Sequence, residues 1–186
     1  MSSEEVKGKE SSVETGGYSS SYAKSVASIT ASLGVRKLLF WTVFVAAIVV
    51  HTSKQTVDDY SYGSKTTKYT HYPAYKYFLS VLWIVFAYTF FAAINSGICG
   101  RSGNKYFLLS LLFCDAIMLT LLASATGTAG AVLFIGTKGN SHDGWSKTCN
   151  VFDKFCRYMW ASFGLSIFAC FLLVWIIVLS AGAIKA

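Results

Sequence analysis

The stretch YFLLSLLFCDAIMLTLLASATGTAGAVLFIGT, from Tyr106 to Thr137, contains 32 residues and a single charged side chain, that of Asp115. A helix needs about 20 mostly apolar residues to cross the roughly 30 Å of hydrocarbon in a bilayer. This stretch is longer than that, so it can span a membrane with some tilt. It predicts a transmembrane helix over about 106–136, with one carboxylate inside it.

Two further runs of similar length contain no charge at all. Tyr77–Gly100 has 24 residues and Tyr158–Ile184 has 27 residues without a charged side chain. Each is long enough for a membrane span of its own. These runs predict helices over about 77–99 and 158–184.

A fourth apolar run, Leu38–Val50, is weaker because it has only 13 residues. A full span must begin near Ala31 and therefore include Arg36 and Lys37. Long basic side chains tolerate such a position, since they extend toward the headgroups. We predict this helix over about 31–52, which gives four spans in total.

The composition agrees with a membrane bundle. Only 13% of the 186 residues are charged, against about 25% in soluble domains. The polar first 30 residues lack the apolar core of a signal peptide and predict a disordered cytosolic tail over 1–30. The loops, about 53–76 and 137–157, are too short for a further domain. We expect an all-α membrane protein, a bundle of four transmembrane helices with left-handed antiparallel packing.

No pattern in the sequence predicts catalysis, a cofactor or nucleic-acid binding. There is no Ser/His/Asp set able to converge in one leaflet, no metal-ligand cluster and no phosphate-binding loop after a strand. His142 beside Asp143 fits a polar pair in a loop better than a weak metal site. The net charge of +7 comes from scattered residues rather than a basic stripe. We expect no enzyme activity, no cofactor or metal, no nucleic acid and no small-molecule substrate.

Asp115 lies nine residues from the start of its span, about 13 Å deep at 1.5 Å per residue. An Asp near the centre of a span costs about 2.5–3.5 kcal/mol on insertion scales, so it normally has a partner. Arg36 enters the first span from the same side, and its guanidinium fork suits a carboxylate. Lys37 points about 100° away around the helix. We predict an intramembrane ion pair between Arg36 and Asp115 that docks the first helix on the third.

The same two residues allow an alternative, a small ion or proton channel or transporter. A relay needs several titratable groups along a path, and no other acid or histidine lies within a predicted span. A polar passage also needs inward polar groups on the second helix, where Thr89 and Asn95 are the candidates. Docking is therefore the favoured interpretation. An adhesion module is a third alternative, but the 53–76 loop has no cysteine pair.

Nine small residues in a row, ASATGTAGA, follow in the third span at 123–131. Among them Ala123, Gly127 and Ala131 recur at intervals of four, a spacing that lets helices approach closely in lipid. Two uses remain open. A contact within the four-helix bundle is favoured, and a contact between copies of the chain is the alternative.

Cys149 and Cys156 share the last loop. A disulfide needs Cα atoms about 4.4–6.8 Å apart, whereas seven residues of continuous helix would separate them by about 10 Å. A bridge therefore requires a turn between them, and two free thiols are the alternative. Lys and Arg are equally divided between the two sides, eight against eight, so the positive-inside rule does not decide the orientation. The short basic connector RSGNK favours cytosolic termini.

The segment IGTKGNSHDGWSKTCNVFDKFC after the third span resembles the Casparian strip membrane domain protein-like (CASP-like) family of plants. The resemblance extends to Arg36 in the first span, Asp115 in the third and TSKQT at 52–56. The matching residues of the segment are Gly136, Lys138, Gly139, Asn140, Ser141, His142, Trp145, Cys149, Asn150, Phe155 and Cys156.

This resemblance implies a MARVEL-related, four-span bundle in the plasma membrane with both termini in the cytosol. It implies a self-associating scaffold whose partners are copies of itself, related family members and membrane lipids. It also implies that such a scaffold recruits cell-wall-modifying proteins. The first loop lacks the acidic-Leu-Pro-aromatic stretch of the strip-forming members, so a role in lignification is not among these expectations.

Overall fold

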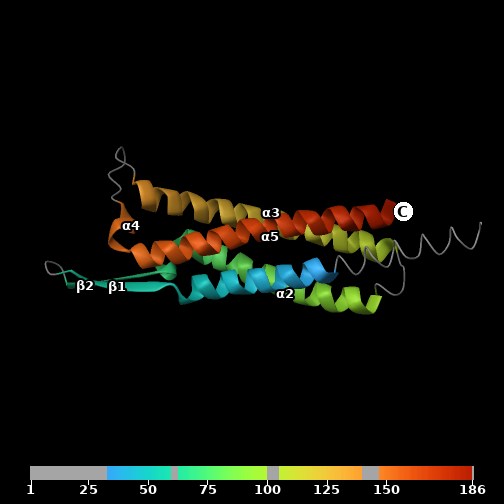
Figure 1. Cartoon of the computed structure of the whole chain (residues 1–186), viewed down its shortest axis with the longest axis horizontal. Helices are drawn as coiled ribbons and strands as arrows, with labels where there is room; N and C mark the ends of the chain where they lie inside the picture. The colour runs from blue at the N-terminus through green and yellow to red at the C-terminus, as the bar shows by residue number, and fades with distance from the viewer. Residues whose placement is uncertain (1–32, 60–62, 100–104, 140–146, 186) are drawn as a thin grey trace, which may run out of the picture.

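The computed structural model of the chain describes residues 33–59, 63–99, 105–139 and 147–185. Four helices are long and apolar enough to cross a membrane, and successive helices run in opposite directions side by side (Figure 1). The chain is an all-α, multi-pass membrane protein with a four-helix bundle. The helices are the first helix (Leu33–Thr52), α2 (Pro73–Cys99), α3 (Lys105–Lys138) and α5 (Asp153–Lys185).

The predicted helix boundaries need correction at two starts. α2 begins at Pro73 rather than Tyr77, and α5 begins at Asp153 rather than Tyr158. Both corrections have a local reason. Proline is favoured in the first turn of a helix, where its missing N–H is not needed, and an acid there interacts favourably with the helix dipole. Counting only uncharged residues therefore missed the polar first turns. The predicted tail, 1–30, lies outside the described residues.

Each helix buries one face in a shared core. In the first helix the buried positions recur with helical spacing, and the other three helices follow the same pattern. The core includes Leu39, Val43, Ala46 and Val50 of the first helix, Phe78, Leu82 and Val85 of α2, Leu122, Ala125, Ala129 and Leu133 of α3, and Met159, Ala169, Leu173 and Ile176 of α5.

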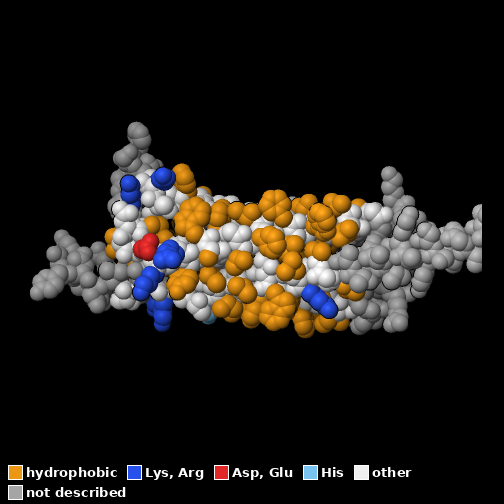
Figure 2. All heavy atoms as spheres, in the orientation of Figure 1, with side chains coloured by type: hydrophobic (Ala, Val, Ile, Leu, Met, Phe, Trp, Pro, Cys, Tyr) orange, Lys and Arg blue, Asp and Glu red, His pale blue; other side chains and the backbone are white. Residues whose placement is uncertain are grey.

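The outer surface of the bundle is apolar as well. Trp41, Phe91, Phe171 and Trp175 are each more than 60% exposed. Figure 2 shows hydrophobic side chains covering the middle of the molecule, with Lys and Arg gathered near one end. Such a surface is a liability in water, whereas lipid tails solvate it.

A hairpin of two antiparallel strands, β1 (Lys54–Asp59) and β2 (Gly63–Lys68), follows the first helix directly. It projects from one end of the bundle (Figure 1) and leads through the short helix η1 (Tyr69–His71) into α2. The sequence predicted only a connection over 53–76, so these strands were missed. Val57 is the only apolar residue in them, and the alternation of apolar and polar residues that marks a strand is therefore absent.

The two faces of the hairpin differ. Residues opposite each other in the register share a face, and Lys54 lies opposite Lys68. Both lysines and Thr56 are exposed, whereas Thr67, on the other face, is buried. The hairpin therefore lies with one face against the protein and turns its lysine-bearing face outward.

Candidate functional site

Arg36 and Asp115 form a two-pronged ion pair inside the bundle. Nη2 of Arg36 lies 2.6 Å from Oδ2 of Asp115, and Nη1 donates to Oδ1 at 3.2 Å. The side chains are 3% and 0% exposed. Lys37, the neighbouring base, is exposed. The first helix and α3 are thus joined by the pair that the sequence predicted.

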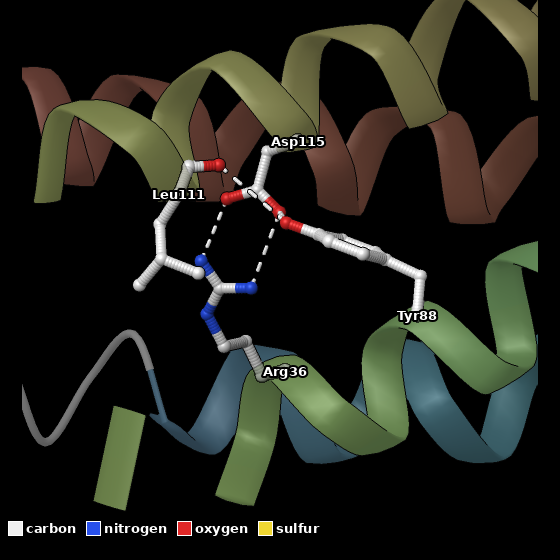
Figure 3. A network of polar contacts seen from close by, with 4 residues as sticks. All are labelled: Arg36, Tyr88, Leu111 and Asp115. Atoms are coloured by element: carbon white, nitrogen blue, oxygen red, sulfur yellow. Dashed lines mark hydrogen bonds and ion pairs between the residues drawn. The ribbon is translucent and has the colours of Figure 1, made fainter. Parts of the chain in front are cut away.

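Tyr88 of α2 is a third member of this site, which sequence reasoning missed. Its hydroxyl donates to Oδ1 of Asp115 at 2.6 Å, and its oxygen lies 3.5 Å from the carbonyl of Leu111. Figure 3 shows these side chains converging from the first helix, α2 and α3. Asp115 therefore holds three helices together rather than two.

The inward polar residues expected on α2 are only half right. Thr89 is buried, but Asn95 is exposed and donates to the carbonyl of Phe91. Tyr88 takes the inward position instead. The 3.6-residue period identifies a face but not which of two adjacent polar residues points toward a neighbour. A tyrosine one helical face away from an intramembrane acid was the available signal.

The acid is well compensated, while the arginine is not fully satisfied. Asp115 accepts hydrogen bonds on both oxygens. Nε of Arg36 and Oγ1 of Thr126 are buried without a partner among the described residues. A charge buried in hydrocarbon is stable only when paired and hydrogen-bonded. The pair is therefore essential to the packing even if it adds little net stability over an apolar contact.

Buried hydroxyl groups elsewhere in the core do not extend the ion pair into a chain. Thr42, Thr89 and Ser166 each donate to a carbonyl of their own helix. Ser162 donates to the carbonyl of Ala46 at 3.1 Å, which ties α5 to the first helix. Their protons are used locally, which favours a structural role over a relay.

The small-residue row of α3 faces outward. Ala123, Gly127 and Ala131 are all exposed, and a Cβ at Gly127 would meet nothing within 4 Å. The favoured interpretation, packing of these three within the bundle, is therefore wrong. Nine small residues in a row offer several rows at a spacing of four, and Ala125 and Ala129 form the buried one.

Gly130 marks the closest approach of α3 to α5. A Cβ built there would lie 2.6 Å from Cε2 of Phe163, shorter than any normal contact. The ring therefore occupies the space that any other residue would need. Absence of a side chain at this position lets Phe163 pack across α3.

Gly130→Leu is expected to destabilise the folded protein by about 1–3 kcal/mol, the usual cost of overpacking a core. Thermal unfolding in detergent, followed by size-exclusion fluorescence, measures the change. Gly127→Leu on the same helix is the matched control, since it has open space, and should keep the wild-type unfolding temperature. Restoration by Phe163→Ala would assign the loss to this contact; two equal glycine variants would contradict it.

The second predicted pair, Cys149 with Cys156, is a disulfide in the structure. Cys149 lies in α4 (Thr148–Val151), and its Cα is 5.7 Å from that of Cys156 at the start of α5. The helices break at Phe152, and this break supplies the turn that the bridge requires. Sγ of Cys149 also lies 3.7 Å from Oγ1 of Thr137. The bridge thus fixes α4 beside the end of α3.

Only part of the loop motif can be located. Lys138 is exposed at the end of α3, and Gly139 has a φ of 72° with its N–H donating to the carbonyl of Ile135 at 2.7 Å. This is the left-handed ending that favours glycine. The remaining motif residues, Asn140, Ser141, His142 and Trp145, lie outside the described residues.

Comparisons with known proteins agree with the site and the fold. The family model for the Casparian strip membrane protein domain matches residues 25–172. CASP-like protein 1D1 of Musa acuminata is 39% identical over 157 residues, covering 79% of this chain and 82% of its own length. CASP-like protein 1D1 of Oryza sativa subsp. japonica is 38% identical over 161 residues, covering 81% and 78%.

A third relative, CASP-like protein 1D2 of Arabidopsis thaliana, is 39% identical over 146 residues, covering 75% of this chain and 73% of its own length. No solved structure matches the chain. The match to the family model covers most of the four-helix bundle, including both members of the buried ion pair and the bridged cysteines. This chain therefore belongs to the CASP-like family of plant membrane proteins.

Proposed function

We propose that this chain is a self-associating scaffold of the plasma membrane. It organises a membrane domain with copies of itself, with related family members and with the surrounding lipids, and it recruits cell-wall-modifying proteins to that domain. Its role is structural rather than catalytic. The observation that carries the proposal is the outward-facing small-residue row of α3, Ala123, Gly127 and Ala131.

This row belongs to a wider surface without bulky side chains. Between Ile117 and Phe134, the exposed positions of α3 are Thr120, Ala123, Ser124, Gly127, Thr128 and Ala131. The hydroxyl groups of Thr120 and Thr128 donate to carbonyls of their own helix, so they need no outside partner. Association of helices in lipid depends on close van der Waals contact, which small residues permit. This surface suits a helix of a second copy.

The orientation follows from the disulfide. Bridges persist in oxidising compartments outside the cytosol, and Figure 1 places α4 and the hairpin at one end, opposite the C-terminal end of α5. We therefore assign the hairpin end to the extracellular side and both termini to the cytosol. The buried ion pair supports the scaffold by keeping α3 in a fixed rotation, with its small residues outward.

Gly127→Leu is expected to weaken self-association by about tenfold or more, equivalent to about 1.4 kcal/mol, because a branched side chain would separate two facing helices. Photobleaching subunit counts, at matched density in native membrane patches, measure the change. Gly164→Leu is the matched control, since Gly164 is exposed on α5 and its Cβ would also meet nothing within 4 Å. An unchanged subunit count for Gly127→Leu would refute association through this surface.

A further inference from the structure

Basic side chains are concentrated at the hairpin end of the bundle (Figure 2). Seven Lys and Arg residues are exposed there, and they come from every element that reaches this end. None of the seven forms an ion pair with another described residue. We call this set the basic rim; it consists of Lys54, Lys68, Lys76, Lys138, Lys147, Lys154 and Arg157.

The arrangement of the rim does not favour stability. Lys54 and Lys68 lie directly opposite each other on the outward face of the hairpin, where like charges repel. Lys154 and Arg157 lie three residues apart on α5, both exposed, and like charges at that spacing also repel. Acids are few nearby: Asp153 is exposed beside Lys154, and Asp58 and Asp59 lie at the far end of β1. Such a rim calls for an anion outside the chain.

The side of the membrane narrows the choice of anion. The disulfide between Cys149 and Cys156 lies at the same end as the rim, so that end belongs in an oxidising compartment. Basic residues are normally in excess on the cytoplasmic side, and the anionic lipids that attract them belong to the cytoplasmic leaflet. A rim on the opposite side lacks that partner.

We propose that the basic rim binds a carboxylate-bearing polymer outside the membrane, an acidic polysaccharide, and so attaches the bundle to the matrix that it faces. This inference rests on the proposed orientation but not on self-association. Charge complementarity carries it: the rim provides an array of separate cations, and a polymer engages many of them at once. Lysine suits the role because it binds as a point charge without a fixed geometry.

The test uses the full-length protein in nanodiscs of phosphatidylcholine. Polygalacturonate is the probe, and its fully methyl-esterified form of the same length is the neutral control. We expect binding of the acidic polymer only, with affinity falling as salt rises because exposed charges are screened. The variant Lys54→Gln/Lys68→Gln/Lys154→Gln/Arg157→Gln should bind about tenfold more weakly or less, with a shallower salt dependence.

Lys37→Gln, an exposed base in the first helix near the opposite end, is the matched control and should bind like the wild type. The fourfold variant should unfold at the same or a higher temperature, since repulsion is removed. Gly127→Leu should still bind the polymer, which separates this inference from self-association. Equal binding of both polymers, no binding, or binding by the fourfold variant at wild-type affinity would each overturn it. So would a rim that engages only phosphatidylserine added to the nanodiscs.

Discussion

Replacing Asp115 by leucine should destabilise the folded protein by about 3–5 kcal/mol, the cost of leaving one charge of a buried pair without its partner. Arg36 is 3% exposed and cannot reach solvent without moving the first helix. Far less folded protein should therefore reach the cell surface. Surface biotinylation, together with thermal unfolding of the purified fraction, measures the loss.

The size of this effect has two internal controls. Arg36→Met/Asp115→Leu replaces the pair with apolar groups and should recover much of the lost stability, because neither charge is then buried alone. Tyr88→Phe removes only the hydroxyl bond to the carboxylate and should cost about 1.5–3 kcal/mol. If the Asp115→Leu single mutant and both control variants accumulated normally, the docking role of the pair would be wrong.

Cys149→Ser is expected to cost about 2.5 kcal/mol, from the chain entropy of the short loop that the bridge closes. α4 would then lose its attachment to α5, since the side chain of Cys149 is held by that bridge and by the contact with Thr137. Cys170→Ser, a free and half-buried cysteine of α5, is the control. Unfolding temperatures with and without reductant provide the measurement.

A thiol count makes the same prediction independent of stability. The chain has five cysteines, so one bridge leaves three free thiols in the denatured wild type (5 − 2) and four in Cys149→Ser (5 − 1). Five free thiols in the wild type would show that the bridge is absent in the cell. A maleimide that cannot cross the membrane, added after reduction of intact cells, reports the side on which the cysteines lie.

The main features of the fold and the ion pair are predictable because hydrocarbon imposes severe constraints. A charge-free run long enough to span lipid indicates a membrane helix, and an acid at the depth of Asp115 requires a nearby base. Only Arg36 met that requirement. Tyr88 was not predictable in the same way, since tyrosines are common near spans and burial of a hydroxyl depends on the rotation of α2.

Rotation also explains the error in the small-residue row. The row through Ala123 and the row through Ala125 have the same spacing and nearly the same composition, so only the packed structure decides which is buried. The hairpin was missed for a different reason: strands outside lipid, here with Val57 as their only apolar residue, carry no hydrophobic alternation. The left-handed twist and the relation to MARVEL proteins stay predictions.

The ion pair also has a consequence for synthesis. Arg36 and Asp115 are 79 residues apart in the chain, and ribosomes add about 5–20 residues per second. For about 4–16 seconds the first span therefore contains an unneutralised guanidinium, which weakens its partition into lipid. During this interval the nascent chain must remain beside the translocon until α3 emerges, so membrane integration of the first segment is completed by the third.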